Sequence, residues 1–168
     1  MKCLCFSDSH GSSYYISRAL ALHPDAEVVF FLGDGISDFE EAVISDRKPR
    51  AYFAVRGNCD NLASFMNRPV KKTETLTLLG RKIVITHGDV YMVKYSDDGL
   101  KKLAASESAD VVIFGHTHRP IEKYVNLDLQ NVYFFNPGSI GTGYGNVPTY
   151  GVISMDEDNI LFSHGSFA

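Results

Sequence analysis

The chain has 168 residues, a formal net charge of −4 and 45% hydrophobic residues, which fits one soluble domain over residues 1–168 with a substantial core. This mild acidity argues against binding to a long nucleic acid, and the absence of a signal-peptide pattern or a long apolar run argues against a membrane. Three cysteines, two of them inside an apolar run, do not suggest a disulfide framework and favour the cytoplasm.

The N-terminal half alternates apolar runs of strand length with amphipathic patterns of helical period. We expect a strand over 1–6, a helix capped by Ser12 or Ser13 and stopped by Pro24, a strand over 28–32, a helix over 38–44 and a strand over 51–55. This repeated order of strand, polar turn and helix predicts a mostly parallel sheet with right-handed crossovers.

The second half is richer in short strands. It begins with a hairpin over 73–79 and 82–86, with Gly80 in the turn, followed by a helix over 97–108 and a buried strand over 111–114. Further strands are expected over 121–125, 132–135, 150–155 and 160–163, and the glycine-rich stretch 138–145 is expected to be a loop. We predict that this part is mostly antiparallel.

Five of the predicted strands end in a polar cluster. The clusters are Asp8-Ser9-His10, Gly33-Asp34, Gly57-Asn58, His87-Gly88 and Gly115-His116-Thr117-His118. In an α/β sheet the carboxyl ends of neighbouring strands open into one crevice, where ligands bind. The adjoining glycines would let the backbone turn sharply and approach a bound ion. We therefore expect these clusters to converge.

Seven of these side chains are metal-ligand types. They are Asp8, His10, Asp34, Asn58, His87, His116 and His118. One divalent ion takes about four to six protein ligands, so seven suit two ions roughly 3.5–4 Å apart that share a carboxylate. With Asp34 as the bridge, one ion takes Asp8, His10 and His118, and the other takes Asn58, His87 and His116. A nitrogen and oxygen ligand set without thiolate suits Mn, Fe, Zn, Co or Ni.

Each of these residues also has a purely structural explanation. Asp8 and Asp34 are of a type common at helix N-caps, Asn58 suits a left-handed turn, and His87 can donate to a carbonyl in a bend. Taken singly, each such explanation is as good as a ligand role. Their occurrence together at successive strand ends favours the metal site.

His116 and His118 follow the strand over 111–114 directly. Histidines at i and i+2 of an extended backbone point the same way, so the pair presents two imidazoles towards one spot. A pair of turn histidines bonded to the backbone is the alternative. His23 and His164 lie outside any polar cluster, and we expect both to be surface or packing residues.

These motifs resemble, in the same order, those of the calcineurin-like metallophosphoesterases. The usual family form is D-x-H, G-D, G-N-H-[DE], G-H or H-G, and G-H-x-H, and the match spans residues 8–118. The turn at Asn136-Pro137-Gly138-Ser139 also resembles one found in small members. The resemblance implies an α/β (α+β) fold of four layers, an αββα sandwich in which two mixed β-sheets lie face to face between helices. It also implies two divalent metal ions in the site assigned above. Mn is the first candidate, and Fe, Zn, Ni, Co or Mg are the others.

One position departs from the family pattern. Many members have a histidine after the motif asparagine, the usual candidate for protonating the leaving group, whereas this chain has Cys59. A thiol with a pKa of about 8.5 is a poorer match for that role. Better leaving groups need less protonation. The small branch with Asn-Cys-Asp resembles phosphodiesterases.

Three residues of this motif are expected to take part in catalysis. Asn58 would stabilise charge on the phosphoryl oxygens, and Asp60 would orient a neighbouring ligand. Cys59 either acts in place of the histidine or is a loop residue with no chemical role.

The predicted function is therefore a metal-dependent phosphoesterase, namely a phosphodiesterase that hydrolyses a small phosphodiester with a hydroxide activated by two metal ions. The alternatives are a non-catalytic metal-binding scaffold of the same fold, a phosphomonoesterase or a nuclease. The complete ligand set weighs against a scaffold, and the acidic charge weighs against a nuclease. A homo-oligomer is a further expectation, with an interface that uses Tyr14, Tyr15, Phe39 or Tyr91.

Overall fold

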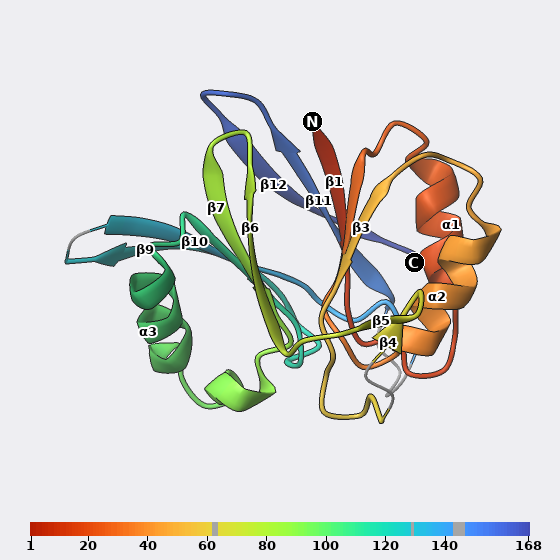
Figure 1. Ribbon diagram of the computed structural model, residues 1–168, viewed down its shortest axis with the longest axis horizontal. Helices are drawn as coiled ribbons and strands as arrows, with labels where there is room; N and C mark the ends of the chain where they lie inside the picture. Colours follow the sequence, from red (N-terminus) through yellow and green to blue (C-terminus); the bar gives the residue numbers. More distant parts are fainter. Residues whose placement is uncertain (62–63, 129, 143–146) are drawn as a thin grey trace.

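The computed structural model describes residues 1–61, 64–128, 130–142 and 147–168. Two five-stranded β-sheets lie face to face, with helices α1 (Tyr14–Leu22) and α2 (Ile36–Ser45) on one outer side and α3 (Asp98–Glu107) on the other (Figure 1). The predicted four-layer αββα fold is confirmed. Within the described part of the chain, no helix is long and apolar enough to cross a membrane.

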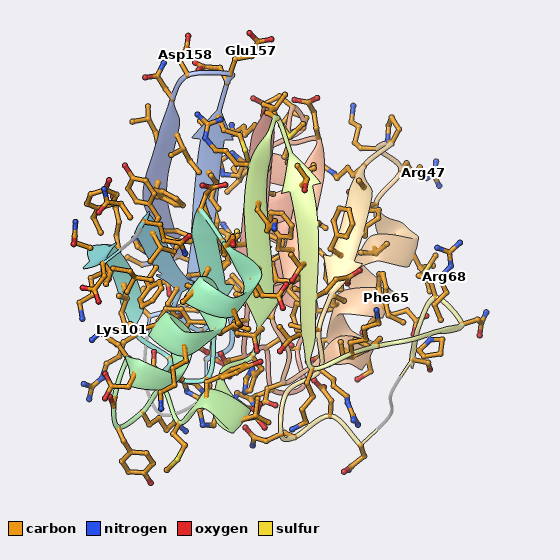
Figure 2. All side chains as sticks on the ribbon, turned by 60° about the vertical axis from the view of Figure 1, so that its left-hand side comes forward. Arg47, Phe65, Arg68, Lys101, Glu157 and Asp158 are labelled. Carbon is orange, nitrogen blue, oxygen red and sulfur yellow. The ribbon has the colours of Figure 1, made fainter. Side chains whose placement is uncertain are left out.

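The first sheet has the strand order β12-β11-β1-β2-β3. Its strands are β1 (Lys2–Phe6), β2 (Val28–Phe31), β3 (Ala51–Ala54), β11 (Thr149–Met155) and β12 (Ile160–Ser166). The strands β1, β2 and β3 are parallel, as their βαβ connections predict, whereas β11 runs antiparallel to β1 and β12. Glu157 and Asp158 lie at the tip of the β11–β12 hairpin (Figure 2).

The second sheet has the order β6-β7-β8-β10-β9. Its strands are β6 (Thr73–Leu78), β7 (Arg81–Thr86), β8 (Val111–Phe114), β9 (Pro120–Leu127) and β10 (Gln130–Pro137). The β6–β7 hairpin is confirmed, and the prediction of mostly antiparallel pairing holds for β6–β7, β9–β10 and β11–β12, whereas β8 pairs parallel with both β7 and β10. Helix α3 makes a crossover between β7 and β8. The chain then passes to the edge of the sheet as β9 and returns between β8 and β9 as β10.

Three short elements were not predicted. They are β4 (Ser64–Phe65), β5 (Arg68–Pro69) and the 3₁₀ helix η1 (Asp89–Tyr91). Elements of two or three residues are too short to show a hydrophobic period, so the sequence pattern does not predict them. The expected loop over 138–145 is irregular as far as residue 142, and its remainder lies outside the described residues.

Alternate side chains of the central strands face different layers. Leu4 and Phe6 pack outward against α1 and α2, whereas Cys3 and Cys5 face the second sheet. All four are fully buried, which confirms the prediction that both cysteines are core residues. Strands that are buried on both faces read as continuous apolar runs, and their ends are held rigidly by packing on both sides.

Other side-chain predictions had mixed outcomes. His23 lies 3.0 Å from the Tyr150 hydroxyl and His164 stacks on Phe135, so both are packing residues as expected. Ser13 is the N-cap residue of α1, as predicted, but its side chain makes no capping hydrogen bond, and Ser12 Oγ accepts from the Tyr14 N–H at 3.4 Å. Phe39 is fully buried in the core and is therefore excluded from any oligomer interface.

Candidate metal centre

The five polar clusters meet at one edge of the molecule, at the lower edge in Figure 1, where β1, β2, β3, β7 and β8 end. Backbone hydrogen bonds join neighbouring ends, from Asp8 N to the Gly33 carbonyl (2.9 Å) and from Gly115 N to the His87 carbonyl (3.0 Å). The His87 ring links the two sheets by donating from Nδ1 to the Leu32 carbonyl at 2.7 Å. The predicted convergence is thus present.

One group of ligand atoms contains Asp8, His10 and His118. Asp8 Oδ1 lies 3.1 Å from His118 Nε2 and 3.8 Å from His10 Nε2, and the two ring nitrogens are 3.2 Å apart. Asp8 is fully buried, and its Oδ1 accepts no well-directed hydrogen bond from the residues that the structure describes. A buried carboxylate oxygen without such a bond is costly, and a cation at this point would satisfy it.

A second group contains Asp34, His87 and His116. His87 Nδ1 donates to the Leu32 carbonyl, so in the neutral ring its Nε2 carries the lone pair, as in metal-ligating histidines, whereas in the protonated ring Nε2 donates towards Asp34. That nitrogen faces three other acceptors, namely His116 Nδ1 at 3.1 Å, Asn58 Oδ1 at 3.2 Å and Asp34 Oδ2 at 3.4 Å. Acceptors crowded in this way require a proton or a cation between them, so the residues present fit a metal ion.

Asp34 lies between the two groups. Its carboxylate, a ring nitrogen of His10 and the Cys59 sulfur form a third group whose ligand atoms all lie within 4.8 Å of one another. The Cys59 N–H donates to Asp34 Oδ1 at 2.7 Å, and Oδ2 faces His87. The three overlapping groups therefore run continuously across the site.

The charges of the site reinforce one another. Burial raises the pKa of Asp34, but the hydrogen bond and charge of His87 outweigh it and hold that pKa well below its usual range. Burial lowers the pKa of His87, but the bond to Asp34 and the charges of Asp8 and Asp34 raise it overall. Burial, then the positive charges of His87 and Lys94, lower the pKa of His116. The two buried carboxylates thus create a negative potential that attracts a cation.

Asp60 faces the backbone of two loops. Its Oδ1 accepts from the N–H groups of Gly35 (2.8 Å) and Ile36 (3.0 Å), and its Oδ2 accepts from those of Asp34 (2.8 Å) and Gly57 (2.7 Å). Four hydrogen bonds to one carboxylate fix the loop that carries Asp34 against the loop that carries Asn58. Asp60 therefore lies where a residue that orients the ligand Asp34 must lie.

The ligand-bearing loops have an unusual backbone. Asp8, His10, Asp34, His116 and His118 have φ values of 58°, 48°, 59°, 66° and 58°, in the left-handed region. This region costs about 1–2 kcal/mol for each residue that has a Cβ, so the surrounding hydrogen bonds must hold it. Such strain typically accumulates at functional sites.

The conformation of the His116–His118 turn differs from the prediction. The expected extended backbone is wrong, because both residues have positive φ and Thr117 N donates to the Gly115 carbonyl at 2.8 Å. The two rings therefore diverge, and His116 lies with His87 whereas His118 lies with His10. His116 and His118 therefore belong to different groups of potential ligand atoms.

The structural alternatives for single residues are mostly wrong. Helix α2 begins after Gly35 and α1 after Ser13, so neither Asp8 nor Asp34 is an N-cap. Asn58 is not among the residues with positive φ. The carbonyl contact proposed for His87 is present, but it orients the ring for the site instead of replacing that role.

Two glycines let the loops approach one another closely. A Cβ at Gly57 would lie 2.0 Å from Asp34 Oδ1, and a Cβ at Gly115 would lie 2.0 Å from Ser7 Oγ. Both distances are far below van der Waals contact. The glycines thus make room for ligand side chains and their supports, which is a narrower role than the expected approach to an ion.

Several supporting residues were not predicted. Ser7 Oγ donates to Asp8 Oδ2 (2.6 Å), Ser139 Oγ donates to the Asp8 carbonyl (2.8 Å), and Asp38 accepts from Ser9 Oγ (2.6 Å) and Gly11 N (2.8 Å). Nothing in the sequence distinguishes Ser7 or Asp38 as a support, whereas Ser139 belongs to the turn noted from the sequence. Asn136, in the turn noted from the sequence, donates to the Gly115 carbonyl at 2.8 Å and holds the His116–His118 turn.

Comparison with known proteins decides the family. The profile of the calcineurin-like phosphoesterase superfamily domain matches residues 1–158. The chain belongs to the calcineurin-like phosphoesterase superfamily. It is 29% identical to phosphodiesterase YfcE of Escherichia coli strain K12 over 179 residues, covering 96% of this chain and 91% of that protein. It is 30% identical to the probable metallophosphoesterase YsnB of Bacillus subtilis strain 168 over 161 residues, covering 94% and 86%.

Solved structures show the same fold. The predicted phosphoesterase from Streptococcus pneumoniae TIGR4 superposes with a TM-score of 0.74 at 22% identity over 99% of this chain and 97% of that one. Vps29 from Entamoeba histolytica in complex with Zn²⁺ has a TM-score of 0.74 at 19% identity over 100% of both chains. The resemblance drawn from the motifs is confirmed, and the chain is a calcineurin-like metallophosphoesterase, a family of metal-dependent phosphoester hydrolases.

Proposed function

We propose that this metallophosphoesterase is a phosphodiesterase whose centre holds two divalent cations with Asp34 as their shared ligand. The observation that carries the proposal is the overlap of the ligand groups, in which Asp34 stands between the Asp8–His10–His118 set and the His87–His116 set. One ion alone could not coordinate all of these ligand atoms. Two ions that share one carboxylate use them all.

The residues divide between the two cations as follows. The first position takes Asp8 Oδ1 with ring nitrogens of His10 and His118, and the second takes His87 Nε2, His116 Nδ1 and Asn58 Oδ1. When bound, divalent cations in such a pair act as Lewis acids that lower the pKa of water and neutralise charge on the phosphoryl group. The set of oxygen and imidazole ligands suits Mn²⁺, and Fe, Zn, Ni, Co or Mg are the other candidates.

The chain's own residues orient this centre. His87 is held in one tautomer by the Leu32 carbonyl, and Asp8 is held by Ser7 Oγ and the His116 N–H (3.1 Å) at its Oδ2, which leaves Oδ1 facing the site. The Asn58 amide lies at the edge of the second group and is exposed, so it can also meet a phosphoryl oxygen. Preorganised ligands of this kind need no reorganisation during the reaction.

The preference for a diester rests on Cys59. Burial, together with the hydrogen bond and charge of Asp34, raises the pKa of the Cys59 thiol to about 11, so it is a poor proton donor near neutral pH. A leaving group that departs without protonation suits such a site. The name of the relative YfcE, phosphodiesterase, agrees with this preference.

The space beside the centre suits a small substrate. A cavity of about 250 Å³ adjoins Cys59 and is lined by Ile36 and Glu40 of α2, Asp60 of the loop after β3 and Ser64 of β4, among others. Typical pockets for drug-sized ligands measure about 300–1,000 Å³. We assign this cavity to one ester substituent of a small phosphodiester.

The experiment compares two esters. The protein is stripped of metal and reloaded with Mn²⁺, and an aryl phosphodiester is assayed beside an aryl phosphomonoester. We expect chelator-sensitive hydrolysis of the diester above all, and its loss in Asp34→Asn but not in the exposed control Asp25→Asn. Diester hydrolysis that survives both the chelator and Asp34→Asn contradicts the proposal, and an Mn²⁺-loaded protein inert towards both esters favours the scaffold alternative.

Metal content tests the division of ligands. We expect wild-type protein to bind two ions per chain, and His116→Gln and His118→Gln each to lose or weaken a different one, because the two rings belong to different groups. Manganese titration followed by paramagnetic resonance distinguishes a coupled pair from a single ion. Two variants that lose the same ion would refute the assignment.

A further inference from the structure

Cys59 has a position that neither of its expected roles explains. Its sulfur lies in the group with a carboxylate oxygen of Asp34 and a ring nitrogen of His10, and all three ligand atoms are within 4.8 Å of one another. Ligands on opposite sides of one transition-metal ion, at bond lengths of about 2.0–2.3 Å, lie about 4–4.6 Å apart, and neighbouring ligands lie closer. The 4.8 Å limit exceeds this span by only a few tenths of an ångström, so small side-chain shifts would bring the three atoms into one coordination sphere.

The loop holds the sulfur in this place. The Cys59 N–H donates to Asp34 Oδ1 at 2.7 Å, and the Asn58 amide donates to Cys59 Sγ at 3.2 Å. The first bond ties the backbone of Cys59 to the shared carboxylate, and the second engages the sulfur as an acceptor. The carboxylate of the next residue, Asp60, accepts hydrogen bonds from the N–H groups of Asp34 and Gly57, so Cys59 is not a freely moving loop tip.

We propose that Cys59 Sγ is a ligand of the cation held by His10. His10, Asp34 and Cys59 would then share this cation, which would hold one thiolate beside imidazole and carboxylate ligands. On binding, the S–H bond breaks, the proton passes to solvent water, and the sulfur lone pair forms the bond to the metal. The proposal rests on the metal centre described above and does not depend on the phosphodiesterase assignment.

This role changes the expected metal preference. A thiolate is a soft ligand that favours Zn²⁺, Co²⁺ or Cd²⁺ over Mn²⁺ and Mg²⁺, whereas the second position keeps only nitrogen and oxygen ligands. The two positions should therefore differ in metal preference. A sulfur bound to the cation also cannot donate a proton to a leaving group, so the ligand role excludes the acid role.

The experiment uses Co²⁺ as a spectroscopic probe. Metal-stripped protein is titrated with Co²⁺, and a thiolate-to-cobalt charge-transfer band is sought in the near ultraviolet. We expect the band in wild-type protein and its loss in Cys59→Ser, while the visible d–d bands remain because the other ligands are unchanged. Cys3 and Cys5 are fully buried in the core, so the band can arise only from Cys59. The neighbouring variant Asn61→Ser is the control and should keep the band.

A second measurement compares affinities. We expect Cys59→Ser to weaken Cd²⁺ binding about tenfold or more relative to Mn²⁺ binding, and Asn61→Ser to leave this ratio unchanged. Wild-type protein that binds two Co²⁺ ions without a charge-transfer band overturns the ligand role alone. Protein that binds no Co²⁺ overturns the metal centre with it, and a band in protein that hydrolyses no phosphodiester supports the ligand role while the proposed function fails.

Discussion

Asp60→Asn tests whether the metal centre is assembled by the four hydrogen bonds beneath it. The wild-type carboxylate accepts two N–H groups at each oxygen, from Gly35 and Ile36 at Oδ1 and from Asp34 and Gly57 at Oδ2. An asparagine has the same shape but only one acceptor oxygen. Whichever way its amide is turned, two hydrogen bonds are lost and an NH₂ group faces two N–H donors.

The expected loss follows from these contacts. A hydrogen bond to a charged group contributes about 1.5–3 kcal/mol, and two are lost. Asp60 is partly exposed, so water can relieve some of the cost, and we expect the free energy of unfolding to fall by about 3 kcal/mol. For a urea m-value of about 2 kcal/mol/M, the unfolding midpoint falls by about 1.5 M. A domain with a typical stability of about 5–15 kcal/mol would remain folded at 25 °C.

The assay is urea unfolding of the metal-stripped protein, followed by Mn²⁺ titration of the folded variant. Because the Asp34 loop loses two of its supports, we also expect Mn²⁺ affinity to fall about 10–100-fold, as for other residues that orient metal ligands. Asp158→Asn is the matched control, since this side chain lies at the tip of the β11–β12 hairpin (Figure 2). A midpoint and an Mn²⁺ affinity equal to those of Asp158→Asn would refute the reasoning.

Three further predictions concern the same centre. Gly57→Ala places a methyl group 2.0 Å from Asp34 Oδ1, so calorimetry should show Mn²⁺ affinity reduced about 10–100-fold, whereas Gly80→Ala, with open space around its Cβ, should bind normally. In the metal-free protein the pKa of His87 is raised, so a proton competes with the metal for its Nε2 already above pH 6.5, whereas the pKa of His116 is lowered and this ring stays neutral to lower pH. Mn²⁺ affinity should therefore fall as the pH drops from 8 to 6. A constant affinity over this range would contradict it. Finally, Mn²⁺ at about 100 times its dissociation constant should stabilise the fold by about 2.7 kcal/mol, measured as a rise in unfolding midpoint that a chelator reverses.

Much of the fold could be predicted because its central strands are buried on both faces. The apolar run over 111–114 coincides with β8, and the run that begins at residue 28 gives β2 to within a residue. The run that begins at residue 51 also gives β3 to within a residue, although β3 is a partly exposed edge strand. The position of β10 could not be predicted in the same way. Its pairing with β8 depends on the chain passing first to the edge strand β9, a choice made by contacts far apart in the sequence.

In the candidate site, too, local features could be predicted from the sequence and long-range contacts could not. The residue types at the strand ends were enough to predict which side chains converge, because each polar cluster follows directly after an apolar run. The direction of the His116 and His118 rings was not predictable, since their turn is held by Asn136 and by Asp8, which is 108 residues away from His116. The Asp8 contact also crosses from one sheet to the other, so it forms only when the two sheets pack together.

The centre therefore depends on how the two sheets are placed relative to each other. Its ligands come from both, with Asp8 and Asp34 on the first sheet and His87 and His116 on the second. The core between the sheets is apolar, and such packing fixes their spacing but is non-directional. Direction comes from polar contacts that cross between them, from His87 Nδ1 to the Leu32 carbonyl (2.7 Å) and from His116 N to Asp8 Oδ2 (3.1 Å). Because these contacts use atoms that do not face the cation, they can orient the ligands before any ion binds, and folding itself prepares the site.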